Sequence, residues 1–517
     1  MKIGKILDPI HGLIEITEIE EFIINQRIFG RLRKVKQNTL LNYVFPGANH
    51  TRFEHSIGVM HLAEIIFNKS NENVEATRIK NEKYGKDKEY KAIKEICDDD
   101  ELLKVTIQEL RLAALLHDVG HGPTSHKFDD FTITGEKLLE ILSSDSENFS
   151  EFIEDFKFHI QSNRDEKIQH ELVSSVFIIK LINTLKKESN FSKDSISIIQ
   201  AVSIKNILKM IDPKFLPKHE IIINEKNCTD YFNSIIASFP FDADRMDYLY
   251  RDSFYSGVKY GFFDQSRILT SLLPIEHKNR ITLGIKKSGL DSIVRFIQSR
   301  NHLYNQVYFH KTNSATNTML DFVFRNLSDK SALEDVKKYS AYEDFYCKNG
   351  DEYFFNSTLK DCLNSNECAP CEDVCVENEV LDELLDRNLW KRIYEERIND
   401  KEARENKDFE KHKFDSDKLS NLKDEFEVQG IFIHENYSSN LGLKGAKKSK
   451  SVLIDKKSNQ IIDDWSAVSD EIQFLNQTNV FIKRIYLRRG SKNVNDLKID
   501  EEEVIGKMEK NGLILKK

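Results

Sequence analysis

The chain has 517 residues, 39% of them hydrophobic and 31% charged, which is long enough for a sizeable core and, by length alone, for about three domains. Its formal net charge of −9 argues against a chain-wide, non-specific nucleic-acid binder, although a local basic patch stays compatible with it. No apolar run approaches the roughly 20 residues of a membrane span, and the first residues lack the apolar core of a signal peptide, so we expect a cytoplasmic enzyme without a membrane partner.

The first predicted helices bring a histidine to the core. A helix is predicted at about residues 19–36, and another at residues 50–68. In the second helix, His55 shares one face with apolar residues at i+4, i+7 and i+11, so this face should turn inward. Residues 69–100 are dense in Lys, Glu, Asn and Asp with little apolar period, and we interpret them as a solvated insertion.

A helical run at residues 107–116 leads into the pair His117–Asp118. Leucines at i, i+3 and i+4 give this run an apolar face, and two glycines and a proline stop the helix by residue 123. A His–Asp pair at the buried end of an apolar helix is costly unless something satisfies it. A bound cation would satisfy it, because imidazole and carboxylate are common metal ligands.

The helix predicted within residues 236–275 offers a further ligand. Asp244 begins a series of polar residues that recur every four positions and therefore share one helix face. Asp242 and Asp247 compete with Asp244 by sequence alone. The predicted metal set is His55, His117, Asp118 and Asp244.

The remaining chain is predicted to be mostly helical until its last part. Residues 131–235 fit helices, residues 281–285 a short strand, and residues 289–326 a long helical stretch broken near Asn313. Short β-rich runs follow at residues 429–434, 451–454 and 480–487. We therefore expect a mainly α fold with a helical core at 1–330, a charged helical extension at 331–425 and a small α+β lobe at 426–517.

Four of the seven cysteines cluster in the extension, at Cys362, Cys368, Cys371 and Cys375. They suggest either a small zinc site or redox-sensitive clip, or a polar loop with incidental thiols. No second CxxC or His pair completes a standard zinc spacing, which favours the loop.

Four motifs occur in a fixed order: Asp8–Gly12 (DPIHG), Tyr43–Ala48 (YVFPGA), Arg52–Ser56 (RFEHS) and His117–Pro123 (HDVGHGP). This pattern resembles the HD-domain metal phosphohydrolases, and within them the dNTP triphosphohydrolase family. The likeness is dense from about residue 4 to residue 327. It implies an HD-domain helical core and a divalent transition metal (Mn, Fe or Zn), with additional Mg as an open alternative.

The resemblance also implies a set of catalytic residues, His121, His126, Asp129 and His170. His126 and Asp129 are three residues apart, so Asp129 could orient a protonated His126, which we favour as general acid. His170 is the alternative acid, and without the resemblance it would fit a helix-surface histidine equally well.

Positions that contact substrate in the family match further residues of this chain. Arg52, Arg245, Tyr248 and Arg300 match triphosphate contacts, and Gln37, Asp252 and Tyr308 match deoxyribose contacts. The alternative for the charged residues is ordinary surface ion pairing. Asn38 and Phe309 depart from the pattern of the SAM-and-HD-domain relative, which leaves base preference and the choice between dNTP and NTP open.

Nucleotide-gated relatives read a guanine activator through residues that this chain mostly lacks. Asn25 and Gly30 replace an Asp and a Gln, and Leu7 replaces a polar contact, whereas Arg33 and Lys311 match. We therefore expect no obligatory GTP activation, with another nucleotide effector left open. Family members form dimers, tetramers or hexamers, so we expect a homo-oligomer.

The leading hypothesis is metal-dependent hydrolysis of dNTPs to deoxynucleoside and tripolyphosphate. The alternatives are another HD phosphohydrolase acting on NTPs, nucleoside monophosphates or nucleic-acid ends, and a nucleotide-binding regulator with weak activity. Control of nucleotide pools and defence against phage both remain open as biological roles.

Overall fold

The structure is a computed structural model that describes residues 2–83, 90–161, 163–325, 333, 335–364, 376–398, 413–427, 431–440, 450–455, 460–465, 468, 480–489 and 501–514. The described chain is mainly α-helical, which confirms the predicted fold class. No helix among these residues combines the length and the apolarity that a membrane crossing needs.

The α-helices up to residue 325 are α1 (Glu18–Ile24), α2 (Arg27–Gly30), α3 (Arg52–Lys83), α4 (Ile93–Ile96), α5 (Asp100–Leu116), α6 (Gly135–Ser143), α7 (Ser146–Phe149), α8 (Ile153–His159), α9 (His170–Lys187), α10 (Lys193–Ala201), α11 (Ile204–Ile211), α12 (Thr229–Ile236), α13 (Ala243–Ser256), α14 (Gln265–Leu269), α15 (Leu290–Leu303) and α16 (Lys311–Arg325). The later helices are α17 (Tyr339–Lys348), α18 (Asp351–Tyr353), α19 (Leu359–Asn364), α20 (Val376–Leu385), α22 (Ser416–Glu427) and α24 (Glu501–Lys510).

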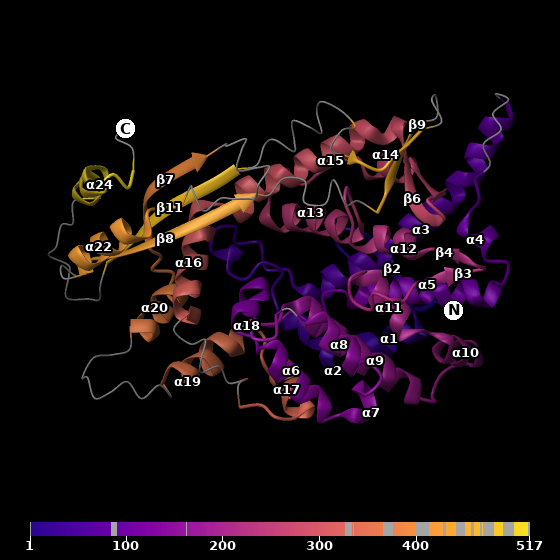
Figure 1. The fold of residues 1–517 in the computed structure, drawn as a ribbon, viewed down its shortest axis with the longest axis horizontal. Helices are drawn as coiled ribbons and strands as arrows, with labels where there is room; N and C mark the ends of the chain where they lie inside the picture. The colour runs from indigo at the N-terminus through magenta and orange to yellow at the C-terminus, as the bar shows by residue number, and fades with distance from the viewer. Residues whose placement is uncertain are drawn as a thin grey trace.

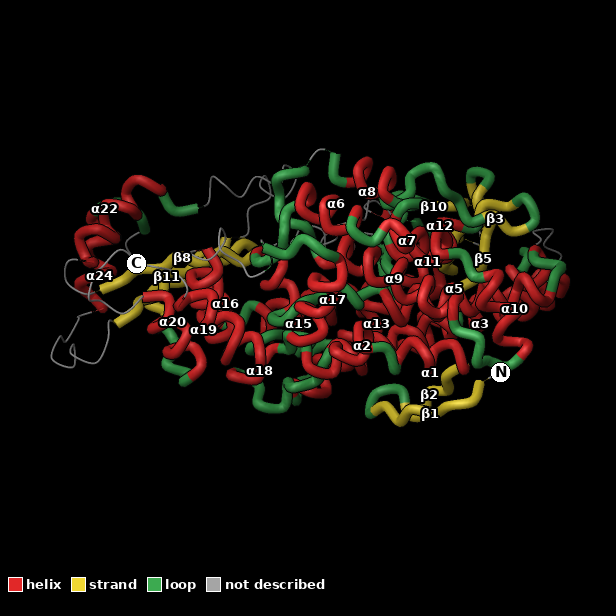
Figure 2. The backbone as a smooth tube through the Cα atoms, turned by 90° about the horizontal axis from the view of Figure 1, so that it is seen from below, coloured by secondary structure: helices red, strands yellow, loops and turns green. Residues whose placement is uncertain are grey.

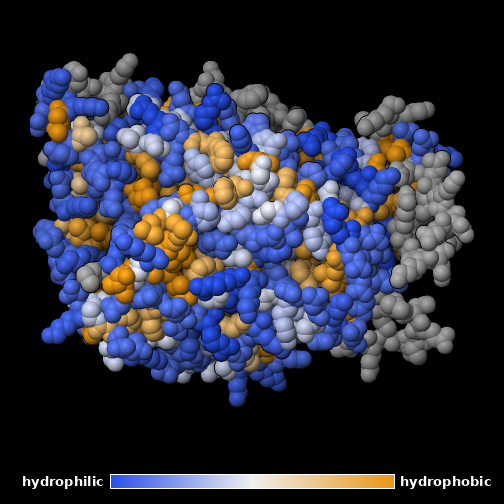
Figure 3. Space-filling view, turned by 180° about the vertical axis from the view of Figure 1, so that it is seen from behind, coloured by the Kyte–Doolittle hydropathy of each residue, from blue (hydrophilic) through white to orange (hydrophobic). Residues whose placement is uncertain are grey.

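The strands form three sheets among the described residues. They are β1 (Lys2–Asp8), β2 (Gly12–Thr17), β3 (Ile222–Ile223), β4 (Lys226–Asn227), β5 (Leu272–His277), β6 (Arg280–Lys286), β7 (Lys391–Ile398), β8 (Ile431–Asn440), β9 (Val452–Asp455), β10 (Gln460–Ile462) and β11 (Val480–Arg489). β1 and β2 form an antiparallel hairpin at the edge of the helical body, as Figure 2 shows. The face in Figure 3 is largely hydrophilic, with apolar side chains in separate groups.

Local sequence signals set the ends of the helices that carry the predicted metal ligands. The Asp99 side chain caps α5 by accepting hydrogen bonds from the first backbone N–H groups of the helix. Asp242 caps α13 in the same way, and α13 ends at Gly257, whose φ of +70° favours glycine. Both helices pack against α3, so three distant segments meet at one place in the core.

Two predicted segments differ from their expected extents. α3 continues to Lys83, so the first part of the charged segment at 69–100 is helical and prolongs the helix that carries His55. The stretch at 289–326 divides into α15, a π-helical turn at Tyr304–Tyr308, and α16, so the break lies just before Lys311 and not at Asn313.

The C-terminal part is divided between two sheets. β7, β11 and β8 form one antiparallel sheet, which lies beside α16 at the left of Figure 1. β9 instead pairs in parallel with β6, and β10 pairs with β9. β7 also lies inside the range that was expected to be helical. Cys362 is buried, whereas Cys368, Cys371 and Cys375 lie outside the described residues, so the zinc prediction is not addressed.

Candidate metal centre and active site

Side chains from α3, α5 and α13 converge on one point. The ligand atoms of His55, His117 and Asp244 lie within 4.8 Å of one another. Asp244 Oδ1 lies 3.2 Å from His55 Nε2 and 3.8 Å from His117 Nε2. The two imidazole rings are 69° from parallel with centroids 5.3 Å apart, so their in-plane lone pairs can meet at a common point.

The tautomer of each histidine is fixed by a partner on the other ring nitrogen. His55 Nδ1 lies 2.7 Å from Asp247 Oδ2, and His117 Nδ1 lies 2.8 Å from the carbonyl oxygen of Ala114. Both partners are acceptors, so each Nδ1 carries the proton and each Nε2 presents a lone pair. Neither buried Nε2 atom has a hydrogen-bond partner among the described residues. This is the arrangement in which histidine binds a metal.

The electrostatics of the site also require a positive charge. Burial by itself lowers the pKa of the His55 imidazole, but Asp244 and Asp247 together outweigh burial and raise that pKa to about 10. The same contacts with His117 and His55 lower the pKa of the Asp244 carboxyl despite its burial. A divalent cation between these groups would supply the charge that a proton supplies otherwise.

Asp118 lies beside this group. Its Oδ2 is 3.6 Å from His55 Nε2 and its Oδ1 is 3.5 Å from His117 Nε2. The Arg52 guanidinium also contacts Oδ2. The two competing aspartates face elsewhere: Asp242 caps α13, and Asp247 holds the far side of His55. The residues present therefore fit a cation held by the predicted H…HD…D set.

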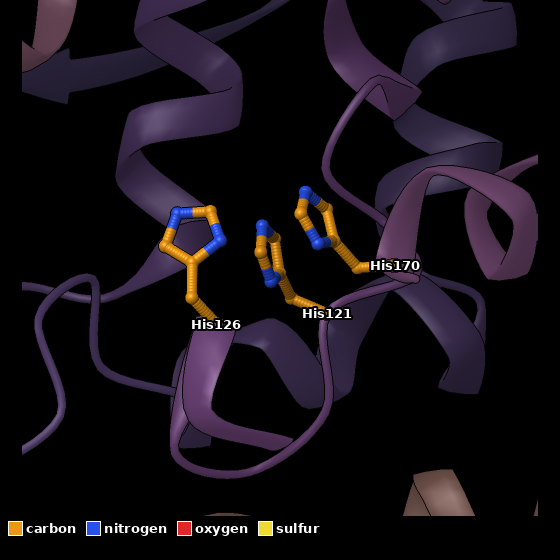
Figure 4. A group of neighbouring side chains, drawn as sticks. All are labelled: His121, His126 and His170. Carbon is orange, nitrogen blue, oxygen red and sulfur yellow. The ribbon is translucent and has the colours of Figure 1, made fainter. Parts of the chain in front are cut away.

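A second cluster contains the imidazoles of His121, His126 and His170, which Figure 4 shows from three different segments of chain. The rings of His121 and His170 stack, with centroids 3.7 Å apart and planes 17° from parallel. An imidazole lone pair lies in the ring plane, so two stacked rings cannot both direct lone pairs onto one ion at the usual distance of about 2.0–2.1 Å. We therefore assign no metal to this cluster, although its nitrogen atoms lie close together.

The second cluster has a different charge state and a different solvent exposure. Burial, reinforced by Arg52 and His170, holds the pKa of His121 well below its usual range and lowers the pKa of His126 to about 3, so both rings are neutral. His170 is half-buried at the first turn of α9, and His126 is exposed. His126 is therefore the ring of the three that a bound molecule can reach most directly.

Asp129 pairs with a histidine other than the one that the spacing suggested. Its Oδ2 accepts a hydrogen bond from His170 Nδ1 at 2.8 Å, and its Oδ1 accepts one from the backbone N–H of His170 at 3.2 Å. The suggested pairing with His126 is wrong in this structure. The physical reason is that the first turn of α9 offers the carboxylate both an imidazole donor and a free backbone N–H.

A cavity of about 430 Å³ opens next to both clusters. Its lining includes residues predicted from the sequence to contact substrate: Gln37, Arg52, His126, Tyr248, Asp252 and Tyr308. Arg52 connects the cavity to the metal ligands, because its guanidinium contacts Asp118 while its Nε donates to Ser125 Oγ at 3.1 Å.

Asp252 makes three side-chain hydrogen bonds in this cavity. Its Oδ1 lies 2.6 Å from His50 Nε2, and its Oδ2 accepts from Asn38 Nδ2 at 2.9 Å and from the Tyr308 hydroxyl. Gln37 Oε1 is buried without a hydrogen-bond partner among the described residues, so it is available to a donor on a ligand.

Two predicted substrate residues lie outside the lining of this cavity. Arg245 contacts the Asp242 carboxylate and donates to the carbonyl oxygen of Ser238 at 3.0 Å, and it lines a separate cavity. The Arg300 guanidinium lies over the Tyr304 ring, 4.4 Å from its centroid. The structure thus brings most of the predicted substrate residues together, and it places these two at the margin.

Comparison with known proteins agrees with this geometry. Residues 52–185 match the HD domain family. This chain contains an HD domain. It is 29% identical over 389 residues to an uncharacterized protein from Methanocaldococcus jannaschii, a match that covers 75% of this chain and 59% of that protein. It is 26% identical over 357 residues to the deoxynucleoside triphosphate triphosphohydrolase SAMHD1 from Danio rerio, covering 65% and 49%.

The chain spans about half to three-fifths of the length of these two relatives. A crystal structure of a hypothetical protein from Aquifex aeolicus has a similar fold, with a TM-score of 0.57 and 22% identity, over 98% of this chain and 100% of that one. The HD match holds His55, His117 and Asp118, whereas Asp244 lies beyond its end.

The HD domain is supported from outside by a network of buried charges whose role was not predicted from the sequence. Asp247, at the back of His55, also accepts hydrogen bonds from Arg251 Nε at 2.8 Å and Nη2 at 2.9 Å, and lies 2.7 Å from His11 Nε2. Arg251 in turn donates to Asp8 Oδ2 at 2.8 Å. The i, i+4 spacing of Asp247 and Arg251 was the available signal for this pair.

One further residue, Arg31, holds the loop that follows α5. Arg31 is buried and donates to the carbonyl oxygens of Val119 at 2.5 Å and His121 at 2.6 Å. Its guanidinium lies over the rings of Phe177 and Tyr346, at 5.5 and 5.1 Å from their centroids. These contacts fix the backbone on either side of Gly120, and with it the position of the His121 ring.

Asp351, at the start of α18, connects two loops of the cavity. Its carboxylate accepts hydrogen bonds from the backbone N–H groups of Lys36 at 2.9 Å and Thr124 at 2.8 Å. Lys36 precedes Gln37, and Thr124 has a φ of 65°, a strained conformation for a residue other than glycine, two positions before His126. No local sequence signal pointed to Asp351, because its partners lie more than 200 residues away.

Proposed function

We propose that this protein hydrolyses deoxynucleoside triphosphates to deoxynucleoside and tripolyphosphate. The observation that carries this proposal is the position of the 430 Å³ cavity, which joins a sugar-sized hydrogen-bonding site around Asp252 to the metal ligands through Arg52. The name of the SAMHD1 relative supports the same substrate class. In this reaction water attacks the α-phosphorus, and the bond from that phosphorus to the 5′ oxygen breaks.

His55, His117, Asp118 and Asp244 would hold a divalent transition metal, Mn, Fe or Zn. When bound, such an ion lowers the pKa of water and offsets negative charge on the phosphoryl group. Arg52, which reaches both Asp118 and the cavity, is placed to orient a phosphate oxygen beside these ligands. Tyr248 lines the same cavity, and Arg300 lies beside it at the margin, where burial lowers the pKa of Arg300 but Tyr248 and Tyr304 raise it further.

The leaving 5′ oxygen needs a proton, which we assign to His126. This ring is exposed in the cavity, whereas His121 is buried. Burial and Arg52 lower the pKa of His126 to about 3 in the free protein, and the negative charge of a bound triphosphate would raise this pKa. His170 is the second candidate because Asp129 holds its Nδ1 and would stabilise its protonated form. A group that donates to a leaving oxygen contributes about 10²–10⁴-fold in rate.

A ribonucleotide is the second candidate substrate. Asn38 lies at the sugar site with its amide bonded to Asp252, so a hydrogen-bonding group lines this part of the cavity. Apolar walls reject an added hydroxyl only weakly, and an amide rejects it less. We also propose that GTP is not required, because Asn25 and Gly30 lack the groups that would read guanine.

The test is hydrolysis of all four dNTPs and all four NTPs with Mn²⁺, Fe²⁺ or Mg²⁺, with and without GTP, followed by separation of products. Deoxynucleoside with intact tripolyphosphate is the expected result. Pyrophosphate, orthophosphate or a nucleoside monophosphate as product would contradict attack at the α-phosphorus. Light scattering on the same samples tests the expected homo-oligomer.

A further inference from the structure

One part of the cavity lining comes from the C-terminal sheet. Asn436, Tyr437 and Ser438 of β8 line it, together with Asn313 and Asn317 of α16. In Figure 1, β8 runs beside α16. In the sequence, β8 is far from every residue of the metal site. We call Asn313, Asn317, Asn436 and Ser438 the α16–β8 wall.

The wall is fixed in place by buried hydrogen bonds from the neighbouring strand. β11 pairs with β8 over its whole length. Arg484 of β11 is fully buried and donates to the carbonyl oxygen of Phe309 and to Ser314 Oγ, both at 2.8 Å. The Tyr486 hydroxyl donates to the carbonyl oxygen of Lys311 at 2.7 Å. The sheet is therefore fastened to the segment that follows Tyr308, which itself contacts Asp252.

The chemistry of the wall differs from that of the rest of the cavity. Its side chains are neutral amides and a hydroxyl, and the nearby charges of Lys127 and Asp321 neutralise each other at 2.6 Å. The guanidinium of Arg52, which suits phosphate, lines the cavity on the side of the metal ligands. The triphosphate should therefore lie away from the wall.

The wall can both donate and accept hydrogen bonds. Asn436 Oδ1 lies 3.2 Å from Ser438 Oγ, an interaction that does not use the Asn436 amide nitrogen. Asn313 Nδ2 donates to the carbonyl oxygen of Tyr308 at 2.9 Å, which leaves its Oδ1 as an acceptor. Aromatic side chains of Tyr308 and Phe309 line the cavity beside these groups.

Amides that read donors and acceptors, next to aromatic rings that stack, form the environment in which proteins bind a nucleobase. We propose that the α16–β8 wall contacts the base of the bound nucleotide and sets the preference among bases. This inference rests on the proposed function. It makes the C-terminal sheet a specificity element of the active site, although it lies some 250 residues beyond the HD match.

The test is the double variant Asn436→Ala with Ser438→Ala in the full-length, metal-loaded protein. Its kcat/KM is measured for the four dNTPs and for the triphosphate of 1,2-dideoxyribose, which has the sugar and phosphates but no base. The ratio between the best and the worst dNTP should change by about 10-fold or more, since each base contact contributes roughly 1–3 kcal/mol. Hydrolysis of the base-free compound should stay unchanged.

The matched control is Glu435→Gln on the same strand. Glu435 alternates to the other face of β8, where it pairs with Lys423 at 2.6 Å, so its variant should keep the wild-type ranking of bases. Equal losses for all four dNTPs and for the base-free compound would show that the wall is only structural, and an unchanged ranking would show that it does not touch the base. If the double variant does not fold, the single variants Asn436→Ser and Ser438→Ala replace it.

Failure of the proposed function gives a different result. In that case the metal-loaded wild type hydrolyses no dNTP and no base-free compound. The wall is then judged by calorimetric binding of the same five compounds to wild type and double variant. A loss of binding restricted to the compounds with a base supports the inference, and equal binding by both proteins rejects it.

Discussion

Two groups of three polar side chains lie side by side in this active site, and Asp118 separates them, with its Oδ1 3.5 Å from His117 Nε2 and 3.4 Å from His121 Nε2. In the first group the rings of His55 and His117 are steeply inclined. In the second group the rings of His121 and His170 are stacked. In both groups the possible ligand atoms lie within 4.8 Å of one another, so the orientation of the rings decides which group can hold an ion.

The partners of the histidines reinforce this difference. Asp247 and the Ala114 carbonyl take both Nδ1 protons of the first group, which leaves two lone pairs facing Asp244. In the second group, among the described residues, His170 has such a partner in Asp129, whereas the His121 nitrogens make no hydrogen bond and Nε2 lies 3.4 Å from Asp118 Oδ1. The comparison teaches that the acceptor bound to one ring nitrogen of a histidine decides whether the other nitrogen can bind a metal or carry a proton.

The largest expected effect is loss of the ion. His117→Ala should remove bound metal and lower turnover by about 10⁴-fold or more, because a ligand is lost from the ion itself. His121→Ala is the matched control and should keep its metal. Elemental analysis and single-turnover rates measure both. Wild-type metal content in His117→Ala, or a metal-free His121→Ala, would reverse the assignment of the two groups.

The next effect separates proton transfer from metal binding. His126→Ala should slow turnover by about 10²–10⁴-fold with metal content near that of wild type, because only the proton donor is removed. The measurement is kcat at saturating metal and substrate, with elemental analysis of the same sample. An unchanged kcat would move the role of acid to His170.

Asp247, which contacts His55, and Asp129, which contacts His170, should affect different quantities, metal affinity and kcat. Asp247→Asn should weaken metal binding by about 10–100-fold, since it loses the charge behind His55. Asp129→Asn should leave metal binding unchanged and lower kcat instead. Titration against a competing chelator gives the metal affinities. Equal metal affinity in the two variants would show that the support behind His55 does not tune the ion.

The smallest expected effect is a metal-induced increase in the free energy of unfolding, which can be measured without substrate. Metal at 100–1,000 times its Kd should stabilise the folded wild type by about 2.7–4.1 kcal/mol, because it binds only the folded site. His121→Ala should show the same stabilisation, and His117→Ala should lose it. Thermal unfolding with and without EDTA tests this, and a metal-induced shift that His117→Ala retains would place the ion elsewhere.

Sequence patterns predicted what is local and missed what is distant. The positions of His117 and Asp118 follow from one helix and its stop signal, and the structure places them as that pattern indicates. The pairing of Asp129 could not be read from its spacing to His126, because the partner that it contacts, His170, begins another helix. β8 could be predicted as a strand, but its place in the cavity depends on Arg484 and on contacts that no periodicity records.

A chain shortened to the residues that match the HD domain would lose groups on which its own active-site loop depends. Without Asp351, the backbone N–H group of Thr124 would be left buried and unpaired, at a cost of about 1–3 kcal/mol. Without Arg31, the carbonyl oxygens of Val119 and His121 in that loop would lose their donors. Expression of fragments chosen by family boundaries should therefore yield aggregated or metal-free protein, and gene deletions for functional work should spare the chain at least through α18.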